Sequence, residues 1–285
     1  MDSLDLQFIA YETVFFWISS AGIAYLGFAG LEMVWDHFLK LRTGWRETAA
    51  NITIYIGNIL LDFLGLGVLF VIGLAVVEPL AFFELPKNWW FWPLALLAAD
   101  LSYYWMHRLE HEIRVFWAVH VVHHSSPEFN MTTALRLSWL ESLYEWVFFV
   151  PMILLGFGVV ETLIALFIVI QYQSWVHTEK IGSLGILDKI FNTPSVHRVH
   201  HGSDAECLDK NYGGILMAWD HLFGTYQAEI RPVTYGLTEP LWSSNPFTIN
   251  FHEFGNIAQD LKSQKGWRKK RVALFGAPGS LNRDQ

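Results

Sequence analysis

The stretch His107-Arg-Leu-Glu-His111, followed nine residues later by His120-Val-Val-His123-His124, decides how the rest of this chain is interpreted. Residues three and four apart on a helix lie on the same face. Each cluster can therefore direct two or three imidazole rings towards one point. Imidazole is the commonest side-chain ligand for metals such as iron, zinc and copper. The stretch predicts a metal site built on helices.

The HxxHH pattern recurs 77 residues further on, and one more histidine lies where the last apolar stretch ends. A single metal ion with roughly four to six ligands cannot use so many imidazoles. We therefore expect two metal ions with about four or five ligands each. The nine candidate ligands are His107, His111, His120, His123, His124, His177, His197, His200 and His201.

The composition is unusual for a soluble protein and is typical of a membrane protein. Hydrophobic residues make up 53% of the chain, with 14 Trp and 22 Phe, and 16% of the residues are charged. Soluble proteins have about 25% charged residues. The net charge of -8 argues against a nucleic-acid partner. A single cysteine, Cys207, excludes an internal disulfide framework and any multi-cysteine zinc or iron–sulfur site.

Three apolar stretches are long enough to cross a membrane as helices. Residues 8–31 and 52–77 form the first two. The third begins with the aromatic run Trp89-Trp90-Phe91-Trp92, which is typical of a membrane interface, and leads directly into His107. We therefore expect the first histidine cluster to lie where the third span leaves the bilayer.

Two shorter apolar stretches follow, at residues 143–157 and 159–176. Hydropathy leaves open whether they are two short spans or a re-entrant hairpin. The expected fold is an all-α integral membrane protein. It has three transmembrane helices, a hairpin of two shorter apolar helices, and a helical cytoplasmic cap that carries the di-metal site.

We divide the chain into N-terminal transmembrane helices (1–106), a catalytic histidine region that includes the hairpin (107–230), and a C-terminal cytoplasmic extension (231–285). Residues 177–285 hold twelve Lys and Arg, whereas the loop 78–90 holds only Lys87. Cytoplasmic loops carry an excess of Lys and Arg. The histidine site and the C-terminus are therefore expected to face the cytoplasm.

The residues around the histidines resemble the fatty acid hydroxylase/sterol desaturase superfamily. The run Asp100-Leu-Ser-Tyr-Tyr-Trp-Met-His107-Arg108 is similar to its D-x-x-Y-Y-W-x-H-R signature, and residues 192–225 are similar to its C-terminal block. Residues 123–136 are most similar to the alkylglycerol monooxygenase branch and to bacterial sterol desaturase-like members. One departure is His221, which stands where the family pattern often has Arg.

The resemblance implies a membrane-bound di-iron oxygenase that uses O2 and two electrons. Such an enzyme would hydroxylate a lipid C–H bond, with or without O-alkyl cleavage, or desaturate it. The cofactors implied are two Fe ions, which Zn could replace in a structure. The substrate would be a membrane lipid. An external donor of the cytochrome b5, ferredoxin/reductase or pterin type would supply electrons, because the sequence has no flavin, haem or cysteine-cluster motif.

Several alternatives stay open at this stage. Within the same class, the chain could be a sterol or fatty-acid desaturase or hydroxylase proper. A zinc-dependent hydrolase and a metal transporter are more distant alternatives, and the sequence does not determine the oligomeric state. A transporter would spread ionisable residues along its spans, whereas here the histidines gather at one boundary.

Four further residues are candidates for the catalytic site. Asp100 precedes His107 on the same predicted helix, and we expect it to accept the second N–H of a metal-binding histidine, although a simple interfacial aspartate is the alternative. Glu112 follows His111 and could orient a ligand, contact the metal, or remain a solvated charge. Asn130 and Asn211 could hydrogen-bond a ligand or a bound water.

Overall fold

The computed structural model describes residues 3–39 and 44–282 of the chain, and all regular elements in these ranges are helical. Two isolated bridges, Phe191 with Leu216 and Gly202 with Tyr235, are the β-type pairings among them. The predicted all-α class therefore holds for the described residues. The α-helices are α1 (Ser3–Phe38), α2 (Trp45–Leu61), α3 (Gly67–Val77), α4 (Phe91–Glu112), α5 (Arg114–His124), α6 (Val150–Leu154), α7 (Val159–Ser174), α8 (Pro194–His200), α9 (Ala218–Phe223), α10 (Pro246–Ser263) and α11 (Trp267–Phe275).

The helix Trp45–Leu80, which joins α2 to α3, is long and apolar enough to cross a membrane, and among the described residues it alone meets that test. It contains the predicted second span. A π-helical turn at Asp62–Leu66 interrupts it, where Gly65 adopts a φ of 138° that a residue with a Cβ rarely takes. Its apolar side chains point outwards, with Phe63 85% exposed. Such a surface suits lipid better than water.

The other two predicted spans are not identified as membrane-crossing helices among the described residues. Much of the first, residues 8–31, has side chains outside the described set, which for this helix begins at residue 20. The third corresponds to α4, which is a continuous helix of 22 residues. Its buried residues Phe91, Ala95 and Ala99 pack in the main hydrophobic core.

The predicted pair of shorter apolar helices is found at Glu145–Leu154 and Val159–Ser174. The first is built from a 3-10 turn followed by the short helix α6, so it is less regular than expected. The chain reverses at Gly156, where φ is 96° and an added Cβ would lie 2.3 Å from the Phe83 carbonyl oxygen. Both arms of the hairpin pack against α4 in the main core.

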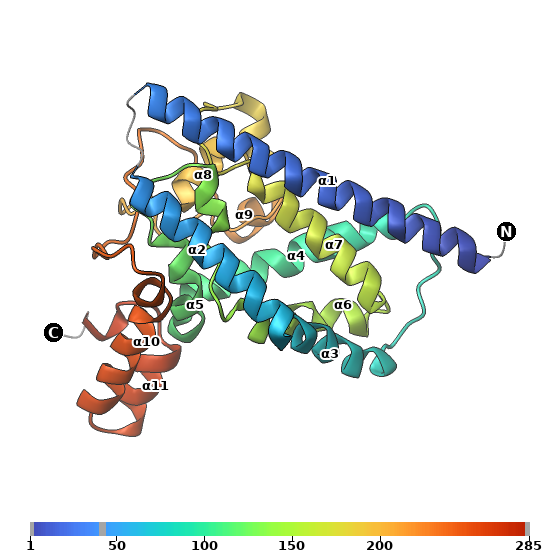
Figure 1. Ribbon diagram of the computed structural model, residues 1–285. Coiled ribbons are helices and arrows are strands. Elements are labelled where there is room, and N and C mark those ends of the chain that lie inside the picture. Colours follow the sequence, from blue (N-terminus) through green and yellow to red (C-terminus); the bar gives the residue numbers. More distant parts are fainter. Residues whose placement is uncertain (1–2, 40–43, 283–285) are drawn as a thin grey trace.

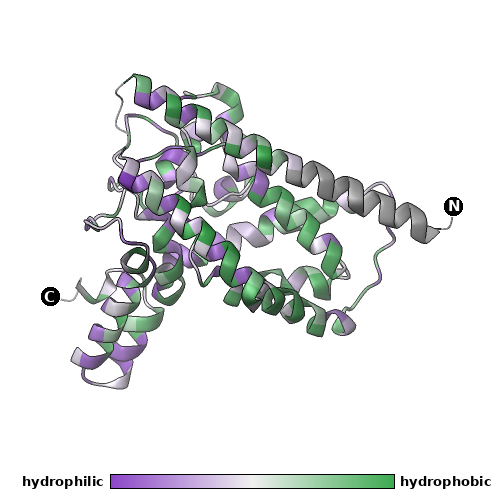
Figure 2. Ribbon diagram, in the orientation of Figure 1, coloured by the Kyte–Doolittle hydropathy of each residue, from purple (hydrophilic) through white to green (hydrophobic). Residues whose placement is uncertain are grey.

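The histidine-bearing helices α5 and α8 gather at the end of the molecule where α1 ends and α2 begins (Figure 1). The buried Arg136 connects α5 to α2. It donates to the Val122 carbonyl oxygen near the end of α5 and to Glu47 and Asn51 at the start of α2. The α10–α11 hairpin projects from the same end. Figure 2 shows hydrophobic residues concentrated on α3, α6 and α7, and hydrophilic ones on α10 and α11.

Candidate metal centre

The structure brings all nine predicted histidines together in two groups. The five-histidine group consists of His107, His111, His120, His124 and His200, and the four-histidine group of His123, His177, His197 and His201. Within each group the candidate ligand atoms all lie within 4.8 Å of one another. The groups are adjacent, since the stacked rings of His124 and His201 have centroids 4.4 Å apart. Each of the two adjacent groups could therefore hold one metal ion.

The helical spacing explains the division: of the two or three rings that each HxxHH cluster was expected to direct towards one point, two share a group. His120 and His124 are four residues apart and share one face of α5, whereas His123 is turned by about 100° from His124. The same holds at α8, where His197 and His201, the residue just after the helix, belong to one group and His200 belongs to the other. Each HxxHH motif therefore supplies two ligands to one group and one to the other.

The distances between ring nitrogens suit shared metal coordination. Two nitrogens bound side by side at about 2.1 Å from one ion are roughly 3 Å apart. The Nε2 atoms of His120 and His124 are 3.1 Å apart in the five-histidine group. In the four-histidine group, Nε2 of His177 lies 3.1 Å from that of His123 and 2.9 Å from that of His197.

Burial keeps these histidines in the neutral form that metals bind. Each of the nine is at most 8% exposed. Desolvation, reinforced in most cases by neighbouring histidines, lowers the pKa of every one of them below its usual value. The pKa falls to about 3 for His177 and about 4 for His200. Near neutral pH the rings are therefore uncharged and ready to coordinate.

Backbone carbonyl groups orient three of the rings. Nδ1 of His107 lies 3.0 Å from the Tyr212 carbonyl oxygen, and Nδ1 of His177 lies 2.9 Å from that of Gln173. Nδ1 of His200 lies 2.9 Å from the Lys210 carbonyl oxygen. A proton held at Nδ1 leaves Nε2 free as a ligand, as in most histidine metal sites.

The remaining nitrogens support a metal as the missing partner. Within the described part of the chain, Nε2 of His107, His111 and His200 is buried without a hydrogen-bond partner, and so is Nδ1 of His123. A buried nitrogen without a partner is costly. The three Nε2 atoms belong to the five-histidine group, so a metal ion there would satisfy them, whereas His123 directs its Nε2, not its Nδ1, to the four-histidine group.

Asp100 is buried near the centre, but it does not contact a histidine as expected. Its carboxylate accepts hydrogen bonds from the backbone N–H groups of Ile215 and Leu216 and from the indole N–H of Trp219. These contacts fix the segment that follows Tyr212, whose carbonyl oxygen orients His107. Asp100 therefore supports the backbone beside the histidines and not a histidine ring.

The other three predicted residues also have structural partners. Glu112 points away from the centre and pairs with Arg108 at 2.8 Å. Asn130 caps the 3-10 helix Met131–Leu135, accepting from the backbone N–H of Thr132. Asn211 bonds the carbonyl oxygens of Val196 and Gln227, and with a φ of 59° it shapes the loop that precedes Tyr212.

The structure adds one residue that the sequence reasoning missed. Glu110 is 2% exposed, and its Oε2 lies 3.3 Å from Nδ1 of His120. The hydroxyl of Tyr144 donates to Oε1 of the same carboxylate at 2.6 Å. A signal was present, because Glu110 is three residues after His107 and so shares its face of α4.

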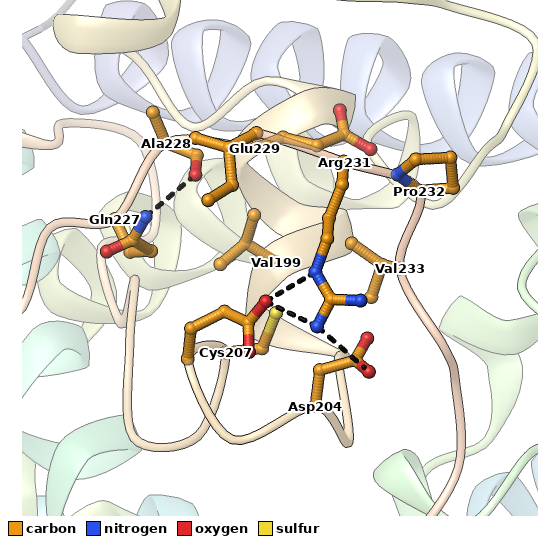
Figure 3. Close-up of a pocket in the computed structure, with 11 residues that line it drawn as sticks. Val199, Asp204, Cys207, Gln227, Ala228, Glu229, Arg231, Pro232 and Val233 are labelled. Carbon is orange, nitrogen blue, oxygen red and sulfur yellow. Dashed lines mark hydrogen bonds and ion pairs between the residues drawn. The ribbon is translucent and has the colours of Figure 1, made fainter.

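Cys207 lies outside the centre, in a small pocket beside α8 (Figure 3). Arg231 crosses this pocket and pairs with Glu206 and Asp204. Burial raises the pKa of the Cys207 thiol to about 11. A protonated thiol is a poor metal ligand and nucleophile.

Comparison with known proteins matches the histidine region to one family. Residues 92–225, which contain all nine histidines, match the fatty acid hydroxylase family model. This confirms the resemblance inferred from the histidine motifs. No solved structure matches the chain significantly.

Individual relatives point to one branch. The chain is 43% identical over 198 residues to an alkylglycerol monooxygenase of Homo sapiens, covering 69% of this chain and 44% of that protein. It is 36% identical over 216 residues to the Caenorhabditis elegans alkylglycerol monooxygenase, covering 70% of this chain and 39% of that one. An ornithine lipid hydroxylase, OlsE of Rhizobium tropici, is 31% identical over 156 residues, covering 50% and 45%. The chain thus spans less than half the length of these relatives.

Proposed function

We propose that this protein is a membrane-bound di-iron oxygenase that hydroxylates a lipid. The main observation behind the proposal is the pair of adjacent histidine groups, one of five residues and one of four. Two iron ions held there would supply the redox chemistry by which O2 and two electrons oxidise a C–H bond. The named relatives include monooxygenases and a hydroxylase of lipids.

The set of candidate ligands favours a di-iron oxygenase over a zinc-dependent hydrolase. All nine candidate ligands are neutral imidazoles, which suit Fe(II) as well as Zn(II). A hydrolytic zinc site usually has three protein ligands and a nearby group that activates water. Here each group offers four or five nitrogens, and the carboxylate of Glu110 faces Nδ1 of His120, not the ligand atoms that the group shares.

The chain's own residues hold and enclose the site. The carbonyl groups of Tyr212, Gln173 and Lys210 orient three histidine rings, and Glu110 faces a fourth. The histidines are almost completely buried, so water is largely excluded from the reacting positions. A lipid could approach from the bilayer, because the site lies near the start of the span Trp45–Leu80.

We further propose that the site and the C-terminus face the cytoplasm, where an external donor would deliver electrons. Cys207 is the chain's sole cysteine, so a cysteine-ligated redox cluster of its own is excluded. The relatives named as alkylglycerol monooxygenases favour hydroxylation next to an ether oxygen, which leads to O-alkyl cleavage, over desaturation. The chain's substrate is therefore proposed to be an ether lipid.

Metal analysis with lipid mass spectrometry tests this function. Protein purified without oxygen should hold about two iron ions per chain, one for each group. With alkylglycerol, O2 and a reductant, the lipid should gain one oxygen atom or release its alkyl chain as an aldehyde. His200→Ala should abolish turnover. The lone His252, which contacts the carbonyl oxygen of Ile249, provides the control His252→Ala with activity retained.

Three results would contradict the proposal. One metal ion per chain in fully active protein would exclude a two-iron centre. Loss of two hydrogens from the lipid, without oxygen insertion, would assign a desaturase instead. Lipid hydrolysis without consumption of O2 would assign a hydrolase.

A further inference from the structure

A cluster of basic residues covers the tip of the α10–α11 hairpin. Ten residues, 262–271, contain six cations and no acidic residue, in a chain whose net charge is -8. Most are exposed, and among the described residues none of the six forms an ion pair. We call this the basic tip, and it consists of Lys262, Lys265, Arg268, Lys269, Lys270 and Arg271.

Helix α10 has one face turned towards the protein. Ile249 and Ile257 are buried, and Glu253 and Asp260 bind the buried guanidinium of Arg114 at 2.7 and 2.5 Å. Arg114 is the first residue of α5, which carries three of the candidate ligands. The hairpin is therefore tied to the histidine site through ion pairs and packing.

A second face of α10 is aromatic and partly exposed. Phe247, Phe251, Phe254 and Ala258 follow one another at three- and four-residue spacing, and the same line ends at Lys262 in the basic tip. Phe247 is 66% exposed and Phe251 40%. We call this the aromatic stripe. A third face is polar and is made by Thr248, His252, Asn256, Gln259 and Ser263.

The hairpin also lies at the level where the candidate span begins. The Ser244 hydroxyl, just before α10, donates to Glu47 at 2.9 Å, two residues after the span starts at Trp45. Trp139 links the two elements: its indole N–H donates to the carbonyl oxygen of Ile54, which lies in the candidate span, and its ring packs against Phe247 of α10. If the helix Trp45–Leu80 crosses a bilayer, α10 starts at its surface.

From these features we propose that the α10–α11 hairpin binds the anionic surface of the membrane. The basic tip contacts lipid headgroups, and the aromatic stripe, with the exposed Trp267 of α11, enters the interface. An anionic lipid surface offers negative charge beside an apolar layer, which matches both features. A purely acidic protein partner would leave the aromatic side chains uncovered. Through Arg114, this contact would hold α5 at the membrane boundary.

The inference rests on the membrane location proposed above, but not on the chemistry. It can be tested in full-length protein in which Cys207→Ser removes the native cysteine. Single cysteines are introduced by Ala258→Cys on the aromatic stripe, Gln259→Cys on the polar face, and Ile72→Cys in the candidate span. Each is spin-labelled in vesicles containing about a third anionic lipid, and its contact with oxygen and with a water-soluble relaxation agent is measured.

The label at position 258 should be shielded from the water-soluble agent, like the label at position 72, whereas its neighbour at 259 should be accessible. Each Lys or Arg near an anionic surface contributes a factor of roughly five in binding. Neutralising Lys269, Lys270 and Arg271 to Gln should therefore lower the ratio of lipid-bound to released hairpin on the order of a hundredfold. Replacing the anionic vesicles by purely zwitterionic ones should likewise lower the ratio of lipid-bound to released hairpin.

Equal water exposure at 258 and 259, with position 72 in lipid, would overturn this inference alone. Water exposure at all three positions would overturn the membrane location as well. Shielding of position 258 that appears only after addition of a purified acidic ferredoxin, and not with vesicles, would assign the face to a protein partner instead.

Discussion

Glu110 and Glu112 differ by two positions in the sequence and have very different surroundings. Glu110 is buried between Nδ1 of His120 and the hydroxyl of Tyr144, while Glu112 is partly exposed and pairs with Arg108. Carboxylates that orient a metal-binding histidine typically change metal affinity about 10- to 100-fold when removed. Glu110→Gln is therefore expected to weaken iron binding by about that factor.

Glu112→Gln is the matched control, because an exposed ion pair contributes roughly 0 to 1 kcal/mol and lies off the site. Both variants should be titrated with Fe(II) under anaerobic conditions. Tyr144→Phe, which leaves the Glu110 carboxylate without its hydroxyl donor, should reduce affinity in the same direction by a smaller amount. Equal iron affinity in the two glutamate variants would contradict the role given to Glu110.

At this scale the sequence predicted which histidines gather better than it predicted their surroundings. Histidine spacing is a local property of a helix, so eight of the nine candidates could be found from spacing alone, and His177 was found from its place at the end of an apolar stretch. The partner of Asp100 could not, because it depends on where residues 215–219 return beside α4. Asn130 caps the 3-10 helix Met131–Leu135, a local role that was overlooked because the residue lies close to the His120–His124 cluster.

Among the helices, the division of each HxxHH motif between two groups makes a distinctive prediction. His123 and His197 come from different helices and belong to the same group. Substituting both with Ala leaves two histidines there, while the five-histidine group is intact. The double variant should therefore retain about one iron ion per chain.

Substituting His120 and His197 provides the comparison, because each group then loses one ligand and keeps four and three. This variant should hold more iron than the same-group pair when both are measured at equal Fe(II) concentration. If the two double variants lose iron equally, the division into two groups is wrong.

The turn of the apolar hairpin is sensitive to a single methyl group. At Gly156 the positive φ and the 2.3 Å approach of the Phe83 carbonyl oxygen leave no room for a Cβ. Such backbone strain costs of order 1–3 kcal/mol. Gly156→Ala should lower the temperature of unfolding in detergent.

Gly255 supplies the control, since it lies within α10 with open space around the added Cβ. Replacing a helical glycine by alanine stabilises by roughly 0.5–1 kcal/mol. The two variants should shift the unfolding temperature in opposite directions. The sequence showed that a break lies near Gly156, but the contact with Phe83 depends on the packed fold.

For the molecule as a whole, hydropathy predicted which segments are apolar but overstated their regularity. Within residues 143–157, the 3-10 helix Glu145–Phe149 precedes the short helix α6, and polar groups beside it are bound inside the protein. Tyr144, for example, donates to Glu110. The candidate span Trp45–Leu80 exposes apolar side chains on its outer surface, which is a feature that an apolar run alone can reveal.

The proposed cytoplasmic orientation rests on the distribution of charge along the chain, and it can be measured directly. The basic tip lies on the hairpin at the histidine end of the molecule (Figure 1), and Lys- and Arg-rich segments remain on the cytoplasmic side. In a chain carrying Cys207→Ser, a cysteine introduced by Gln259→Cys should react with a membrane-impermeant maleimide in inside-out vesicles and be protected in intact cells. A cysteine introduced by Phe82→Cys, an exposed residue beyond the far end of the span, should show the reverse pattern. Labelling of Gln259→Cys in intact cells would place the metal centre on the outer face, where a cytoplasmic electron donor could not reach it.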